Sequence, residues 1–298
     1  PKVQPHMGQP RIGVVHEAPG KFILGTVPVE KDGSAYFRLP SNLPVFFQVL
    51  DREGLAVQTM RSLAYVQAGQ SSTCVGCHEH RDTAPAIGTP PLALGRAPSQ
   101  ITTGPDGTWP LRFDRLVQPV LNEHCISCHH SEATDKQAAK WDLSPERAYF
   151  TLLHFGRRDL FKLADERDRS LVDQMPARNS KLYRLLTSGS GHYDVRLEEE
   201  DRRRLVTWMD TYAHVTGSFS EQQEKQIQNL RLRYASLLMT PTGKKYDDAE
   251  RVVSLSIVGT LRCLLEFPNG FWLGTAVVLL VLGGFSCRAV RRRSSRRG

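Results

Sequence analysis

Apolar and polar residues alternate along residues 11–60 in short runs separated by turn signals. The tetrapeptide at 31–34, Lys-Asp-Gly-Ser, carries the Asp-Gly signal of a tight hairpin. Several short strands at this spacing predict a small β-sandwich or barrel. About fifty residues form a thin core on their own, so we expect this unit to pack on further sequence or on a cofactor. The alternating runs cover residues 12–15, 22–29, 35–39, 45–49 and 55–60.

The pattern changes after residue 82. Residues 83–110 contain six prolines and several glycines, which predicts a linker. From residue 111 the apolar positions follow a helical period, and further helical segments are expected up to residue 218. The first helical face consists of Phe113, Leu116, Val117, Val120 and Leu121.

Three segments follow this helical region. Ser220 and Gln223 form a capping box that opens a polar helix within residues 219–240. No element is predicted in the connector at 241–270. The uncharged apolar run at 271–287 then predicts a transmembrane helix over 271–290, with Trp272 as an interfacial anchor. A buried hydrophobic helix or a mistranslated gene end would be the alternative.

The chain has 298 residues, 40% of them hydrophobic and 23% charged, which suits two small domains with extensions. It begins with proline, so we expect a fragment or a processed chain. Six arginines among the last eleven residues supply six of the eight net positive charges. A basic run confined to 291–298 predicts a cytoplasmic tail behind a membrane anchor, and it argues against nucleic-acid binding.

Four of the six cysteines lie in two Cys-x-x-Cys-His motifs, at 74–78 and 125–129. This pentapeptide is the attachment signature of c-type haem. Two thiols add across the porphyrin vinyl groups, and the adjacent histidine ligates the iron. The sequence therefore predicts two covalently attached haems. The expected cofactor-binding residues are Cys74, Cys77, His78, Cys125, Cys128 and His129.

Three other interpretations of the motifs are weaker. Zinc ribbons use paired Cys-x-x-Cys knuckles about 15–20 residues apart, whereas 47 residues separate Cys77 from Cys125 here. A thioredoxin-like redox pair would be single and would follow a strand of a βαβ unit. Disulfides remain an alternative, although a two-residue gap makes a strained ring. Cys263 and Cys287 lack a neighbouring histidine and are expected to be inert or, near a membrane, lipidated.

The second axial position decides what a haem iron does, because a closed iron carries electrons and an open one admits small molecules. For the haem at 125–129 we favour His192, which follows a Ser-Gly-Ser-Gly run before the last helix of the helical region. The alternatives are His214, His154 and Met175.

For the haem at 74–78, the nearby ligand candidates are His16 and His80, with Tyr65 and Asp82 as oxygen donors.

These observations together predict an α+β multidomain chain. A β-rich domain with the first motif spans residues 1–82, and an all-α, class I-type cytochrome c domain with the second motif spans 111–218. The transmembrane helix follows. Because c-type haem is attached on the periplasmic side in bacteria, we expect the chain on the periplasmic face of the cell membrane.

Parts of the sequence resemble a known family. ILGTVPVEKDGSAYF at 23–37, VQTMRS at 57–62 and CVGCHE at 74–79 resemble the middle domain of hydrazine synthase alpha subunits. VQPVLNEHCISCH at 117–129, with Gly-His at 191–192 and Trp-Met-Asp at 208–210, looks like the cytochrome c domain that follows it. Family members usually carry an N-terminal β-propeller, which supports the fragment interpretation.

The resemblance implies two haems of unequal character. The middle-domain haem is the catalytic one in hydrazine synthase, with a tyrosine ligand shortly after the motif and a zinc ion nearby. Asp82 stands at the matching position here, which places hydrazine synthesis in question. The second family haem is bis-histidine and transfers electrons, which corresponds to His129 with His192.

The leading hypothesis is a dihaem module that transfers electrons between redox partner proteins, with metal ligands His78, His129 and His192. The second hypothesis is a haem oxidoreductase that uses the haem at His78 on a small nitrogen or oxygen species. The third is a haem-based sensor.

Overall fold

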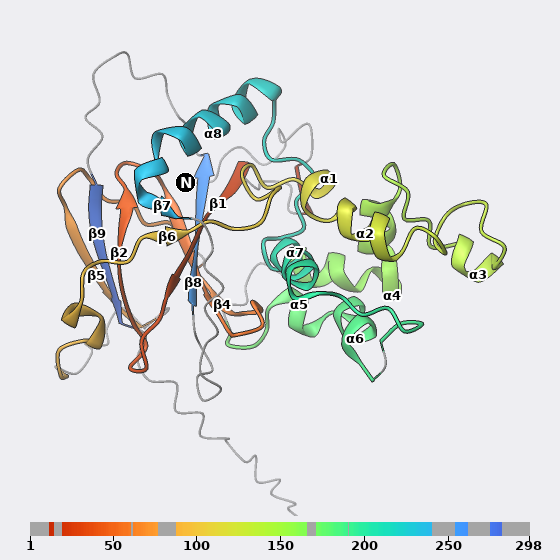
Figure 1. Cartoon of the computed structure of the whole chain (residues 1–298), viewed down its shortest axis with the longest axis horizontal. Coiled ribbons are helices and arrows are strands. Elements are labelled where there is room, and N and C mark those ends of the chain that lie inside the picture. Colours follow the sequence, from red (N-terminus) through yellow and green to blue (C-terminus); the bar gives the residue numbers. More distant parts are fainter. Residues whose placement is uncertain are drawn as a thin grey trace, which may run out of the picture.

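The computed structural model describes residues 12–14, 20–60, 62–76, 88–165, 171–189, 191–239, 254–261 and 275–281. Strands and helices occupy different ends of the molecule (Figure 1). The strands gather at one end, with α8 (Glu221–Arg233) lying across them, and the remaining helices gather at the other end.

Two sheets are present within the described residues. The larger sheet has the strand order β4-β3-β8-β1-β6-β7, and the smaller one the order β2-β9-β5. The strands expected between residues 20 and 60 are present, but β1 and β2 join different sheets, so the Asp-Gly turn does not close a paired hairpin. The strands are β1 (Gly20–Pro28), β2 (Ser34–Pro40), β3 (Val45–Leu50), β4 (Ala56–Thr59), β5 (Ser71–Val75), β6 (Ile101–Thr102), β7 (Leu238–Met239), β8 (Ser254–Leu261) and β9 (Thr275–Val281).

The predicted transmembrane helix is wrong. Its apolar run contains β9, which pairs antiparallel with β2 from Ser34↔Val281 to Pro40↔Thr275 and parallel with β5. A short run rich in Val and Leu also suits a central strand, and periodicity alone does not separate the two cases. Among the described residues no helix combines the length and the apolar character that a membrane crossing needs.

The predicted membrane-anchored location is also wrong, because it depended on this helix as the anchor and on the orientation of the helix. The basic tail at 291–298 lies outside the described residues.

The connector at 241–270 contains β8, which the sequence patterns did not predict. β8 lies between β1 and β3, and both pairings are antiparallel. Its Leu255 and Ile257 are fully buried. The β-rich unit is therefore completed by residues about 200 positions further along the chain.

The helices begin at α1 (Phe113–Leu116) and α2 (Gln118–His124). Ser220 accepts a hydrogen bond from the Gln223 backbone N–H, so the predicted N-cap of α8 is present. Within the described part of the predicted linker, the 3₁₀ helix (Leu92–Gly95) is hydrogen-bonded to Ser34 of β2 through the Ala93 N–H, β6 pairs with β1, and Ile101 is buried. The other helices are α3 (Lys136–Ala139), α4 (Ala148–Asp165), α5 (Pro176–Asn179), α6 (Lys181–Thr187), α7 (Glu199–Asp210) and a 3₁₀ turn (Ala235–Leu237).

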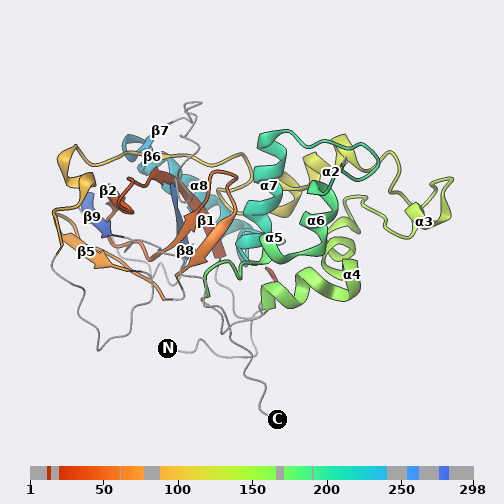
Figure 2. The same ribbon diagram turned by 90° about the horizontal axis from the view of Figure 1, so that it is seen from below.

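Strands and helices share one of the two hydrophobic cores. Ile23 of β1, Phe46 of β3 and Leu55 belong to the same buried cluster as Trp208 of α7. Figure 2 shows α7 and α5 next to the sheet, between it and the outer helices. The predicted separation into a β domain and an independent all-α cytochrome c domain is therefore wrong, and the fold is mixed α/β. Helical periodicity shows which face is buried but not against which element it packs.

Candidate functional site

The second motif follows directly from helix α2. The backbone N–H groups of Cys125 and Ile126 donate to the Leu121 carbonyl at 2.9 Å, and the N–H of His129 donates to the Cys125 carbonyl at 3.0 Å. The chain therefore leaves the helix in tight turns that keep both thiols and the imidazole on one short segment. Cys125 and Cys128 are free thiols, the first half-buried and the second exposed.

The orientation of His129 is set by main-chain contacts. Its Nδ1 lies 3.2 Å from the Ala138 carbonyl oxygen, which accepts the Nδ1–H. Its own carbonyl accepts from the Leu143 N–H at 2.9 Å. An Nδ1–H held by a carbonyl fixes the tautomer and leaves Nε2 as the ligand atom, as is usual for metal-bound histidines.

A tight turn presents His192. The Val195 N–H donates to the His192 carbonyl at 3.0 Å, and Tyr193 and Asp194 have φ values of 49° and 61°. Two central residues with positive φ define a type I′ turn, a geometry that favours Asn-Gly rather than Tyr-Asp. Backbone held in this region by ordinary residues is strained, and such strain clusters at functional sites.

Gly191 is required for this turn. Its φ is +84°, and a Cβ built on it would lie 2.5 Å from the Val195 carbonyl oxygen.

The turn brings His192 to His129. Their ring centroids are 5.7 Å apart and their planes are inclined by 25°. Burial lowers the pKa of His192, and the neighbouring His129 lowers it further. Both effects favour the neutral imidazole, which is the form that binds a metal ion. The two imidazole rings are thus close enough to be ligands of one metal ion.

A cavity of about 540 Å³ contains this histidine pair. That volume lies within the usual range for cofactor sites. Most of its wall is apolar, and Cys125 and Cys128 of the second motif line it. Burial raises the pKa of the Cys125 thiol to about 11, with a contribution from Cys128. The apolar lining includes Val120, Leu121, Trp141, Leu152, Phe155, Leu182, Leu186, Leu197 and Leu205.

These residues meet the requirements of a c-type haem. Two thiols two residues apart and an adjacent imidazole with an engaged Nδ1 are the groups that covalent haem attachment and proximal ligation require. His192 provides a second imidazole on the same cavity, and the apolar wall suits a porphyrin.

The alternative ligands for this site lie elsewhere. His214 is fully buried with its Nε2 2.9 Å from the Lys21 Nζ, and Met175 is buried outside the cavity wall. His154 is exposed and its Nδ1 lies 2.7 Å from the Phe150 carbonyl oxygen of the preceding turn. Of the four candidates, only His192 lines the cavity with His129.

The first motif is described only at its start. Cys74 lies half-buried on β5, and burial raises its pKa. Cys77 and His78 lie outside the described residues, as do the ligand candidates His16, His80 and Asp82. Tyr65 is 66% exposed.

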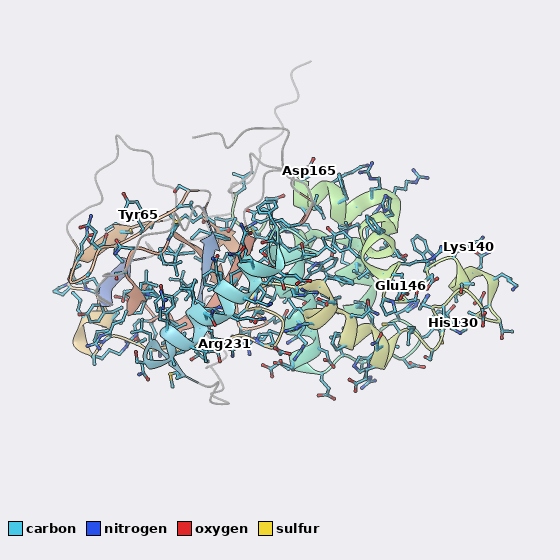
Figure 3. All side chains as sticks on the ribbon, turned by 90° about the horizontal axis from the view of Figure 1, so that it is seen from above. Tyr65, His130, Lys140, Glu146, Asp165 and Arg231 are labelled. Atoms are coloured by element: carbon cyan, nitrogen blue, oxygen red, sulfur yellow. The ribbon has the colours of Figure 1, made fainter. Side chains whose placement is uncertain are left out.

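The strand that carries Cys74 and the helices around the second motif lie at opposite ends of the molecule. β5 lies at the outer edge of the strand end, and α2 and α3 lie at the helical end (Figure 1). Figure 3 shows the same separation, with Tyr65 at one end and His130, next to the second motif, at the other.

Comparison with known proteins concerns the strand end. Residues 9–79 match the family model of the hydrazine synthase alpha subunit middle domain. Over these residues the chain is related to hydrazine synthase alpha subunits. The alpha subunit of Kuenenia stuttgartiensis hydrazine synthase is 39% identical over 56 residues, which is 19% of this chain and 7% of that subunit. No solved structure matches the chain significantly.

The matched segment ends at residue 79, directly after His78, and therefore includes the whole first motif.

Sequence reasoning missed two contributions to the site. The Ala138 carbonyl that orients His129 is a backbone group, so no residue type marks it. The type I′ turn at 193–194 lacks the Asn-Gly signal, and only the preceding glycines hinted at an unusual backbone.

Proposed function

We propose that this chain is a dihaem c-type module in which the haem at 125–129 carries electrons. The observation that carries the proposal is the approach of His129 and His192 in an apolar cavity that also contains Cys125 and Cys128. When bound, haem iron supplies one-electron redox chemistry. His129 and His192 would both hold such a haem, and two imidazole ligands would favour electron transfer over the binding of a small molecule.

The chain's own residues have defined tasks in this proposal. Cys125 and Cys128 would form the thioether links, and the Ala138 carbonyl engages His129 Nδ1, which would leave Nε2 free as the ligand atom. The turn at 192–195 holds His192 against the cavity. The apolar wall excludes water, and a low local dielectric keeps the iron potential sensitive to nearby charges. Electrons would pass to and from redox partner proteins at this end of the molecule.

A second function is favoured by the family relationship. The segment related to the hydrazine synthase alpha subunit contains the first motif, so we propose a second haem held by Cys74, Cys77 and His78. Redox chemistry on a small nitrogen or oxygen species would then occur there rather than at His129. The name of the relative describes a subunit, which supports assembly with further subunits.

Haem stoichiometry tests both parts of the proposal. The chain is expressed with the c-type maturation machinery, beside the double variants Cys74→Ser/Cys77→Ser and Cys125→Ser/Cys128→Ser. The pyridine haemochrome assay is expected to give two haems in the parent and one in each variant. A parent that contains zinc and no haem would overturn the proposal. One haem in the parent, lost only with Cys125 and Cys128, would overturn the second site alone.

A further inference from the structure

A cluster of metal-binding side chains lies outside the proposed haem ligands. Glu123 and His124 end helix α2, and Asp201 lies in the first turn of α7. One ligand atom from each residue lies within 4.8 Å of the other two. Residues 77 positions apart in sequence therefore bring one imidazole nitrogen and two carboxylates together.

The histidine and the aspartate of this cluster are positioned and partly shielded. His124 Nε2 lies 2.9 Å from the Asp201 Oδ2, and their side chains are only 18% and 17% exposed. Glu123 is the exposed member of the group. Asp201 differs in this from its neighbour Glu200, which extends along α7 to Arg204 at 3.4 Å.

We propose that Glu123, His124 and Asp201 bind one divalent transition-metal ion of the zinc class. Zinc accepts imidazole nitrogen and carboxylate oxygen together, and three protein ligands leave a fourth position for water. Calcium takes six to eight oxygen ligands and has no use for the imidazole. The donor set therefore selects for zinc over calcium.

The position of this site gives it a structural effect. His124 directly precedes Cys125 and contributes to the cavity wall. A metal ion held here would connect the end of α2 to the start of α7, and both helices contribute residues to the cavity wall. This inference does not rest on the haem proposal, because none of the three residues is a haem ligand there.

Calorimetric titration of the full chain with zinc chloride tests the site. We expect one binding event in the parent, at least tenfold weaker binding in Asp201→Asn and in Glu123→Gln, and unchanged binding in Glu200→Gln. Glu200→Gln is the matched control because it removes the same charge from the same turn of α7. Calcium chloride is expected to give no binding.

Two results would overturn the inference: zinc binding of parental strength in both Asp201→Asn and Glu123→Gln, or an equal loss in Glu200→Gln. Glu123 is exposed, so Glu123→Gln decides the question if Asp201→Asn does not fold. Haem content is measured in every variant. A loss of zinc binding at parental haem content is expected, and a loss that always follows haem content would also overturn the site.

Discussion

Asp210 at the end of α7 is hydrogen-bonded to Ala56 of β4, so its carboxylate links the helical end of the molecule to the strand end. Its Oδ2 accepts the N–H of Ala56, the first residue of β4, at 2.9 Å, and its Oδ1 accepts the Ala177 N–H of α5 at 2.8 Å. The Asp210 carbonyl also accepts from the Gln48 side chain at 2.8 Å. One buried residue at the end of α7 thus bonds to strands and helices at once.

Replacing Asp210 with asparagine is expected to destabilise the fold. The amide oxygen retains one acceptor, but its NH₂ group would face the second backbone N–H and leave it unpaired. An unsatisfied buried donor costs about 1–3 kcal/mol. Chemical denaturation of Asp210→Asn, beside the exposed Glu199→Gln on the same helix, measures the difference. Equal stability of the two variants would show that the bridge contributes nothing.

Lys21 predicts a pH dependence of stability. Its side chain is buried beside His214, and burial lowers the pKa of its amino group from 10.5 to about 7. Between these two pH values the unfolded chain binds a proton that the folded chain does not, so stability rises as the pH rises. We expect parental unfolding midpoints to increase from pH 7 to pH 9.

The variant Lys21→Met isolates this contribution. It lacks the titrating group, so its midpoint is expected to increase less over the same pH range than that of the parent. Midpoints that increase equally in both proteins would assign the pH dependence to other groups.

Gly191 and Gly189 offer a matched test of the turn that carries His192. Both have positive φ, but a Cβ at Gly191 would clash with the Val195 carbonyl oxygen, whereas one at Gly189 meets nothing within 4 Å. Gly191→Ala is therefore expected to displace His192 and produce a high-spin fraction in the haem spectrum. Gly189→Ala is expected to retain the parental spectrum. Identical spectra for both variants would contradict the role of this turn.

Local sequence patterns predicted the features that short segments of the chain determine. Alternation of apolar and polar residues predicted the strands between residues 20 and 60. The second motif and the glycine before His192 indicated two histidines, His129 and His192, whose rings lie close together in the fold. Both signals lie within short segments.

The errors concern long-range pairing. The run in β9 could form either a helix or a strand, and its partner Ser34–Pro40 lies about 240 residues earlier. For the same reason the sequence did not reveal the shared core or the role of Asp210, since burial against a distant element leaves no local pattern.

The visible spectrum of the His192→Ala variant tests the central claim most directly. His154→Ala is the matched control, because His154 is exposed and lies outside the cavity wall. We predict a low-spin signal from the haem at 125–129 in the parent and in His154→Ala, and conversion of that signal to high-spin in His192→Ala. An unchanged low-spin spectrum in His192→Ala would contradict the assignment of His129 and His192 as the axial pair.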